Sequence, residues 1–237
     1  MRHPLTLLFL CFSCLVSAQR SSLDFSGGLH YSFRTINADE EHDFILAART
    51  EERGIVTGQV GLHYSRQFTD AYGFRSGLRL TALGHQQTAT NLRWGNQHDG
   101  NGGFDPSIDP MEPDGFTIRH DMLFVEVPLL WHQSFGTMAW TPFVEVGFLP
   151  GAYLTTRSQA TGDGTSETNY HDDTQSAINR FQLSSALSLG VDHYCSERFG
   201  LFVQANYRYQ LTPLANGGIK ERLYALGFEM GVRRSLP

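Results

Sequence analysis

The alternation of apolar and polar residues is the feature that most constrains this chain, because it recurs along most of its length. In 24–34, DFSGGLHYSFR, the odd positions include Phe25, Leu29 and Tyr31, whereas the even positions are polar or glycine. A period of two residues is the signature of a β-strand with one apolar and one polar face. We therefore predict an all-β fold with eight strands. The other strands are expected in 56–65, 74–82, 118–132, 141–156, 181–192, 201–210 and 224–232.

The connections between these strands alternate in length. The long segments are rich in Asp, Asn, Gly and Thr, as solvated loops are. Eight antiparallel strands with short turns at one end and long loops at the other are typical of outer-membrane barrels. The layout predicts an eight-stranded antiparallel up-and-down transmembrane β-barrel with both termini on the periplasmic side. The short turns are expected at 69–73, 133–140 and 195–199, and the longer segments at 35–54, 85–117, 157–179 and 212–222.

The alternation alone does not say which face is inside, and a soluble lipocalin-like binding barrel has apolar side chains inside and polar ones outside. Three features favour the membrane barrel. The polar face mixes charges with glycines, the loop lengths are asymmetric, and aromatic residues gather near strand ends on the apolar face, as in interfacial girdles. These aromatic residues are Phe33, Tyr64, Phe68, Phe74, Trp131, Phe199, Tyr207, Tyr209 and Tyr224.

The N-terminal segment MRHPLTLLFLCFSCLVSA reads as a secretory signal peptide. Arg2 supplies a positive charge, an apolar stretch follows, and small residues precede a cleavage site after Ala18. The apolar stretch is shorter than the ~20 residues that a membrane-spanning helix needs. We predict a signal peptide at 1–18 and a barrel domain at 19–237.

Charge and cysteine content narrow the function classes further. Without Arg2, 17 of the 18 basic residues remain against 24 acidic ones, so the predicted mature chain has a net charge of −7. This balance and the absence of a basic cluster argue against a nucleic-acid partner. Cys195 is the one cysteine outside the signal peptide, so no internal disulfide is expected.

The block 123–156, LFVEVPLLWHQSFGTMAWTPFVEVGFLPGAYLTT, resembles the signature region of the PorT-like outer-membrane β-barrel family. The matching elements are Glu126-Val127-Pro128-Leu129-Leu130, Pro142-Phe143-Val144 and Gly147. Segments 180–193, 197–212 and 224–233 resemble the next hairpin and the closing strand of that family. The resemblance implies a barrel in the outer membrane. It also implies a link to protein secretion, with which the founding member of the family is associated.

Charged residues on the polar face are expected to lie together in the narrow lumen. Unpaired buried charges are very costly, so these residues should form ion pairs. We predict a structural plug of ion pairs, and a proton path or gate is the alternative function of the same groups. The predicted lumen charge network consists of Arg34, Arg75, Arg79, Glu126, Glu145, Asp192, Arg208 and Glu229, with Arg233, His30 and His63 on the same face.

The stretch LFVEVPLLW, 123–131, contains a charge and a proline in an otherwise apolar strand. The alternation turns Glu126 inward, where it can meet Arg75 or Arg79. Pro128 also points inward, but it has no N–H for the strand ladder, and a closed barrel has no edge strand to accommodate it. We therefore expect a bulge or a missing ladder bond within a few residues of the following turn.

Two loop segments contain residues that could form a calcium site or a catalytic site, although the sequence signal for each is weaker than that for the barrel. Segment 98–115, HDGNGGFDPSIDPMEPDG, is rich in oxygen ligands for calcium, but its spacing fails the EF-hand template. In the segment TNYHDD, His171 precedes Asp172 and Asp173, with Ser158, Ser166 and Ser176 nearby, which leaves an outer-membrane enzyme acting on lipid or peptide as an alternative.

These observations predict an outer-membrane barrel with a structural or interaction role, a plugged lumen, no cofactor, no metal and no catalysis. The expected partners are membrane lipid and proteins that contact the extracellular loops, especially 85–117, or the periplasmic turns. The sequence does not indicate an oligomeric state.

Overall fold

The computed structural model of the chain describes residues 20–38, 52–90, 100–101, 103, 115–136, 139–162, 165–172, 178–215 and 219–236. The predicted signal peptide, 1–18, lies outside these ranges. No helix in this part of the chain is long and apolar enough to span a membrane. The described residues form the strands β1 (Arg20–Ala38), β2 (Glu52–Gln67), β3 (Tyr72–Thr90), β4 (Gly115–Glu126), β5 (Leu129–Ser134), β6 (Trp140–Gly162), β7 (Thr165–Asp172), β8 (Phe181–Tyr194), β9 (Phe199–Gln210) and β10 (Ile219–Leu236).

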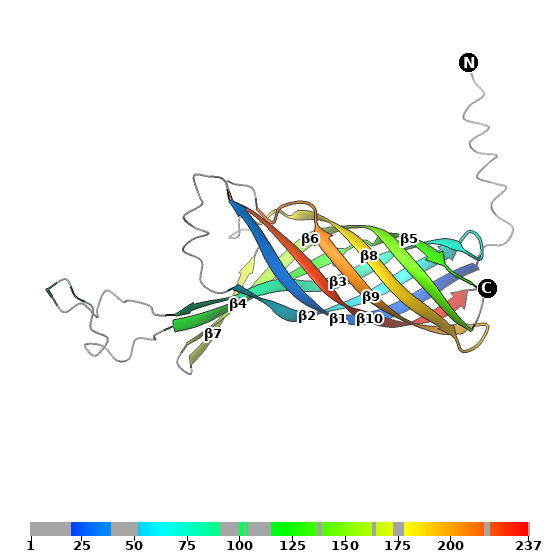
Figure 1. The fold of residues 1–237 in the computed structure, drawn as a ribbon, viewed down its shortest axis with the longest axis horizontal. Helices are drawn as coiled ribbons and strands as arrows, with labels where there is room; N and C mark the ends of the chain where they lie inside the picture. Colours follow the sequence, from blue (N-terminus) through cyan, green and yellow to red (C-terminus); the bar gives the residue numbers. More distant parts are fainter. Residues whose placement is uncertain are drawn as a thin grey trace, which may run out of the picture.

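The strands close into one antiparallel barrel (Figure 1). Neighbouring strands pair in the order β2-β1-β10-β9-β8-β6-β4-β3, and β2 pairs with β3 to complete the ring. β4 and β5 are two halves of one stave, because both lie between β3 and β6, while β7 pairs with β6 outside the ring. Nine of the ten described strands therefore make the eight staves of the ring, which confirms the predicted fold.

The two ends of the barrel differ, and we call them the turn end and the loop end. The turn end holds the first residues of β1, the last residues of β10 and the tight connections between staves. Two of these connections are closed by backbone bonds, from Phe68 N–H to Tyr72 O at 2.9 Å and from Cys195 N–H to Phe199 O at 3.0 Å. The described strand ends that flank the longer connections, such as Ala38 and Glu52 or Thr90 and Gly115, lie at the loop end, as the alternation of short and long connections predicted.

Strands at the loop end are longer than the alternation predicted. β3 runs to Thr90, β4 begins at Gly115 and β6 reaches Gly162, so parts of the expected loops 85–117 and 157–179 are strands. β7 adds a hairpin to β6 beyond the ring, and these extensions project from the barrel in Figure 1. Because the extensions are mostly polar on both faces, they lack the apolar alternation from which the other strands were predicted.

Pro128 interrupts one stave between β4 and β5 without changing its register. Glu126 pairs with Gly151 and Leu129 with Phe148 on β6, so the same alignment continues across the break. Val127 keeps its bond to β6, from its N–H to Pro150 O at 2.9 Å. The interruption is therefore a missing ladder bond on the β3 side. It lies six residues before the end of β5, farther from the turn than we expected.

The residue opposite Pro128 on β3 is Gly77, because Ser76 pairs with Leu129 and Arg79 with Glu126. Gly77 has a positive φ of 157°, and a Cβ there would clash with the carbonyl oxygen of Leu62 on β2. The glycine allows β2 and β3 to approach closely at the place where Pro128 removes a donor from the other neighbour.

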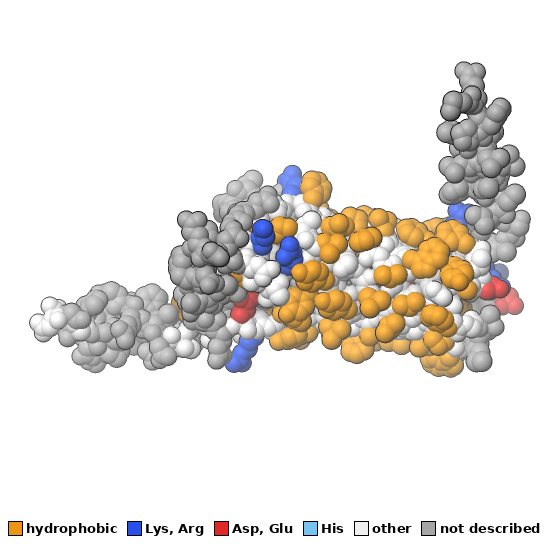
Figure 2. Space-filling view, turned by 45° about the horizontal axis from the view of Figure 1, so that its top comes forward, with side chains coloured by type: hydrophobic (Ala, Val, Ile, Leu, Met, Phe, Trp, Pro, Cys, Tyr) orange, Lys and Arg blue, Asp and Glu red, His pale blue; other side chains and the backbone are white. Residues whose placement is uncertain are grey.

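The outer wall of the barrel is apolar and the lumen is polar. On β1 and β10, the outward side chains of Leu29 and Phe228 are 65% and 69% exposed, whereas the inward His30 and Glu229 are 3% and 2% exposed. Figure 2 shows the outward apolar side chains as a broad band along the wall, with basic side chains at its loop end. This arrangement is the reverse of a soluble lipocalin-like barrel, so that alternative does not describe this chain.

Candidate functional site in the lumen

Inward-facing charges fill the lumen in two clusters. Every stave except β9 contributes a side chain to the first cluster, and β9 contributes Phe202, whose ring centroid lies 4.6 Å from the guanidinium carbon of Arg75. All charged members are buried, so their charges have to be compensated within the cluster. This cluster, which we call the central network, consists of Asp24, His63, Arg75, His132, Glu145, Asp192, Glu229 and Arg233.

Arg75 lies in the middle of the central network and is 1% exposed. Its Nη1 donates to Glu145 Oε2 at 3.2 Å, its Nε lies 3.5 Å from Asp24 Oδ2, and its Nη2 lies 3.5 Å from Glu229 Oε1. The same Nη2 donates to His63 Nδ1 at 3.1 Å. Carboxylates from three staves therefore surround one guanidinium, which compensates the cost of burying it.

Arg233 and His132 form the side of the central network nearer the turn end. Arg233 donates from Nε to Asp24 Oδ1 at 3.0 Å, and its Nη1 lies 2.8 Å from Asp192 Oδ2. His132 Nδ1 lies 3.0 Å from Glu145 Oε1, and its Nε2 lies 4.0 Å from Asp192 Oδ2. His132 thus connects two carboxylates that are held by different arginines.

The second cluster, which we call the Glu126 cluster, joins Glu126 to Arg79 and Arg208. Arg79 Nη2 lies 3.1 Å from Glu126 Oε2, as expected for residues that face each other on β3 and β4. Arg208 donates to both oxygens of Glu126, from Nη1 at 3.1 Å and also from Nη2. Thr81 donates a further bond at 3.0 Å, so this buried carboxylate accepts bonds from three residues on two staves, β3 and β9.

Seven of the eight residues predicted for the lumen charge network lie in these two clusters. Arg34 does not. It shares the inward face of β1, but it lies at the loop end and pairs with Glu52 at 3.0 Å and Glu221 at 2.9 Å. His30 is also separate, because its Nε2 bonds the carbonyl oxygen of Ala82 at 3.0 Å. The alternation gives the face of a residue but not its position along the barrel axis, and that position separates Arg34 from the two clusters. His30 lies close to the Glu126 cluster but bonds a backbone carbonyl instead of a carboxylate.

Sequence reasoning missed two members of the central network, Asp24 and His132. Asp24 was placed on the polar face of its strand, but its partner Arg233 is 209 residues away and meets it only when β1 and β10 close the barrel. His132 continues the inward series of Glu126, Pro128 and Leu130, so the same parity could have identified it.

The two clusters contain five carboxylates and four guanidinium groups in the described part of the chain. Gln59 and Gln204 donate to Glu229 Oε2 at 2.8 and 3.0 Å. Neutral amide groups therefore stabilise a carboxylate where the guanidinium groups are outnumbered. Between the clusters, a cavity bordered by Arg75, Arg79 and Glu229 holds only about 10 Å³. A water molecule needs roughly 10–15 Å³, so this space accommodates about one water.

An apolar cluster closes the lumen at the loop end, in addition to the plug of ion pairs that the sequence predicted. Leu214, which is 1% exposed, enters it from the segment between β9 and β10. Backbone bonds hold that segment, from Leu214 N–H to Glu221 O at 2.8 Å and from Asn179 N–H to Leu214 O at 2.6 Å. The cluster consists of Leu83, Met122, Phe124, Tyr153, Leu214, Leu223 and Ala225, with Ile178 packed against it.

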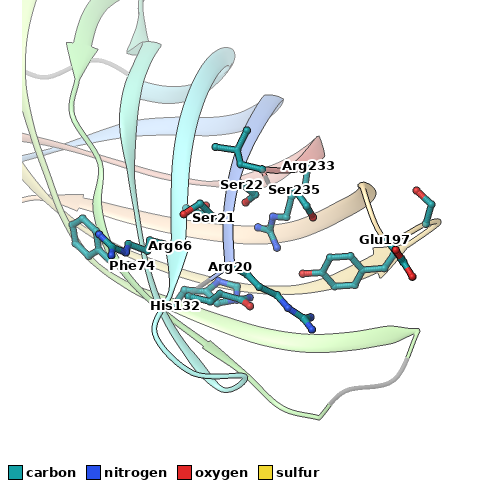
Figure 3. Close-up of a pocket in the computed structure, with 15 residues that line it drawn as sticks. Arg20, Ser21, Ser22, Arg66, Phe74, His132, Glu197, Arg233 and Ser235 are labelled. Carbon is teal, nitrogen blue, oxygen red and sulfur yellow. The ribbon is translucent and has the colours of Figure 1, made fainter. Parts of the chain in front are cut away.

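The turn end instead opens into a polar cavity of about 560 Å³, which we call the vestibule. Figure 3 shows Arg20, His132 and Arg233 around it, with Glu197 from the β8–β9 turn at its far side. Serine hydroxyls supply much of the remaining lining. The vestibule gives water access to the His132 and Arg233 side of the central network, whereas the apolar cluster excludes water from the opposite side.

A serine and a histidine meet at the loop end. Ser158 Oγ lies 2.9 Å from His120 Nδ1, and His120 faces His85 with ring centroids 5.1 Å apart. Asp121 is turned away from His120 and pairs with Arg119, whose pKa is raised by that hydrogen bond. Asp121 therefore does not complete a Ser-His-Asp arrangement.

The other loop residues singled out from the sequence give no site in the described chain. The side chains of His171 and Asp172, together with Asp173, lie outside the described residues. Most of the acidic segment 98–115 lies outside them too. Within the described part, no group of three or more His, Cys, Asp or Glu side chains is arranged to hold a metal ion. Cys195 is exposed in the β8–β9 turn.

Comparisons with known proteins give a family match and several structural likenesses. A family model described as "Outer membrane protein beta-barrel domain" matches residues 17–216. No curated protein sequence matches the chain significantly. The attachment invasion locus protein Ail of Yersinia pestis is 15% identical, with 90% of this chain and 98% of that one covered and a TM-score of 0.36.

Two further solved structures are similar at the same low level. OprG from Pseudomonas aeruginosa is 15% identical, with 93% and 98% of the two chains covered and a TM-score of 0.41. The outer membrane protease OmpT from Escherichia coli is 9% identical, with 92% and 97% covered and a TM-score of 0.39. These likenesses are too distant to transfer an activity, with or without catalysis, to this chain.

Proposed function

Because the chain belongs to the outer membrane protein beta-barrel domain family and is located in the outer membrane, we propose that it acts as a non-conducting barrel with a structural and interaction role. The observation that carries this function is the filled lumen. The ion pairs of the central network and the Glu126 cluster occupy its middle, and the apolar cluster occupies its loop end. Short turns face the periplasm in such barrels, so the loop end is extracellular.

The dimensions of the lumen support the absence of a conducting path. The cavity between the two charge clusters holds about 10 Å³, which is about the space of one water molecule. Ion conduction needs a continuous hydrated route, and eight-stranded barrels have interiors that side chains can fill. The charged residues here pair with one another instead of lining an open channel.

Recordings in planar lipid bilayers test the non-conducting state. The purified full-length mature barrel should insert without producing stepwise conductance, while a general porin in the same bilayer produces it. Insertion is verified by heat-modifiable migration of the reconstituted protein on a gel. Reproducible unitary steps from verified, folded protein would contradict a plugged lumen.

The interaction role is assigned to the strand extensions at the loop end. β3, β4, β6 and β7 continue there as a mostly polar sheet that projects beyond the apolar band (Figures 1 and 2). Tyr170 on β7 is 69% exposed, which is unusual for a large aromatic side chain outside the apolar band. Such exposed aromatic residues are enriched in protein interfaces.

A photo-crosslinking amino acid in intact cells tests this surface. Placed at position 170, it should give a discrete protein adduct, whereas at Tyr72, an exposed aromatic residue at the turn end, it should not give the same adduct. The PorT-like resemblance of segment 124–130 leads us to include a protein-secretion component as the expected partner. Identical adducts at both positions, or no adduct at position 170, would contradict the assignment.

No catalytic step is part of this function. Contact between Ser158 and His120 favours hydrolysis most among the described loop-end groups, but the neighbouring carboxylate of Asp121 is engaged by Arg119. Turnover of ester or peptide substrates by the folded protein, lost in a Ser158→Ala variant, would replace the proposed role with an enzymatic one.

A further inference from the structure

We propose that Lys220 and Arg222 on the outer wall of β10 form a binding site for a phosphate group on the headgroup of an outer-leaflet glycolipid. Both residues lie at even positions of β10, the face on which Leu226 and Phe228 are 58% and 69% exposed. Lys220 is exposed and Arg222 half-buried. The site does not depend on the roles proposed for the lumen and the loop-end sheet, but its place in the outer leaflet rests on the extracellular position of the loop end.

At this end of β10 the acidic side chain points into the barrel and the two basic side chains point outward. Glu221, between the two basic residues, points inward and pairs with Arg34 at 2.9 Å, and Arg34 also binds Glu52 at 3.0 Å. Among the described residues, the two carboxylates near this end of β10, Glu52 and Glu221, are thereby held on the inner side. The outer side keeps two positive charges with neutral neighbours on β1, where Thr35 pairs with Arg222 and Asn37 with Lys220.

The height of the pair along the barrel matches the headgroup layer. Tyr224, the next outward residue of β10, pairs with Tyr209 on β9 and with Phe33 on β1, so an aromatic row lies directly below the two basic residues. Such aromatic girdles mark the interface between acyl chains and headgroups. A lipid with its acyl chains against Leu226 and Phe228 would bring its headgroup to Lys220 and Arg222.

The geometry of the strand suits a single phosphate. Two residues on the same face of a strand are about 6.6 Å apart, so both side chains can reach one anion between them. Arg222 is oriented by a bond from its Nε to Leu211 O at 3.3 Å, which leaves its two Nη groups for a phosphate. The ammonium group of Lys220 supplies the second charge.

Titration of the detergent-solubilised, folded barrel tests the site. The probe is a glucosamine disaccharide lipid with two phosphate monoesters, and bound lipid is counted by native mass spectrometry. Lys220→Ser combined with Arg222→Ser should weaken binding roughly 30-fold, because each basic residue at a lipid surface strengthens binding about fivefold. Arg20→Ser combined with Arg198→Ser removes the same charge at the turn end and should leave binding unchanged.

Two comparison ligands separate a lipid site from a general anion site. The dephosphorylated lipid should bind wild-type protein as weakly as the phosphorylated lipid binds the double variant, and inorganic phosphate alone should not compete at equimolar concentration. Heat-modifiable migration confirms folding of each variant. The charge-preserving exchange of Lys220→Arg with Arg222→Lys should retain binding, which distinguishes loss of charge from local damage.

Three results would overturn this site. Equal weakening by the turn-end variant would show that only net charge matters. Equal binding of the dephosphorylated lipid would show that the acyl chains alone are recognised. Full competition by inorganic phosphate would identify a site for free phosphate and not for a lipid.

Discussion

Replacement of Glu126 by Gln is the most direct perturbation of the filled lumen. Glu126 is 2% exposed and is the carboxylate that contacts both Arg79 and Arg208. Glutamine keeps the size of the side chain, so the change creates no cavity, but it leaves two buried guanidinium groups without a counter-charge. Removing one partner of a buried ion pair costs about 3–5 kcal/mol. We expect Glu126→Gln to lower the free energy of unfolding by about this amount at neutral pH.

Urea unfolding of the barrel in lipid vesicles measures this loss, with tryptophan fluorescence as the signal and heat-modifiable migration as a second probe. Glu197→Gln, in the exposed β8–β9 turn, is the matched control and should leave the unfolding midpoint unchanged. Thr81→Val, which removes one neutral donor to Glu126, should cost about 1 kcal/mol. A loss below about 1 kcal/mol for Glu126→Gln would mean that water compensates Arg79 and Arg208, which would refute a closed lumen at this level.

Three further changes test other parts of the structure. Phe228→Arg places a charge on the lipid face near the middle of the apolar band and should cost about 2–4 kcal/mol in the same unfolding assay, with Lys220→Arg as the tolerated control. Leu214→Ala should cost about 2–5 kcal/mol by opening a cavity in the apolar cluster, and it should speed hydrogen exchange of the Asn179 amide, which bonds Leu214 O. Pro128→Ala supplies the missing donor opposite Gly77, so the new amide should be protected from exchange and the barrel no less stable; an unprotected amide would contradict a continuous register across the break.

The alternation was enough to predict the barrel because each stave separates lipid from a polar lumen. Leu29 and Phe228 face outward and His30 and Glu229 face inward for this reason, and a register error of one residue would reverse all four. The same parity placed Glu126 inward beside Arg79. Short-range rules therefore predicted the face of most residues in the apolar part of each stave, but not how far the strands extend at the loop end.

The same pattern could not predict the position of each residue along the barrel axis or its contacts with distant strands. Asp24 and Arg233 meet because β1 and β10 close the barrel, and Arg34 is excluded from the central network by its height on β1. Leu214 lies in a connection without alternation, so only the folded chain brings it into the lumen. A bulge on β6 lies where Leu123 pairs with Thr155 and Phe124 with Tyr153. Beyond it, the inward and outward positions of β6 are exchanged, and the sequence gives no local signal of this change.

The layers of the lumen imply different environments for the two charge clusters. The vestibule brings solvent to Arg233 and His132, so the turn-end side of the central network can exchange some of its protein contacts for water. The Glu126 cluster lies between the rest of the charges and the apolar cluster around Phe124, and it has no such access in the described structure. An ion pair is most sensitive to loss of one partner where water cannot replace it. We therefore expect Glu126→Gln to be more costly than Asp192→Asn, although both remove one buried carboxylate from an arginine; equal costs would indicate that the two levels of the lumen are equally hydrated.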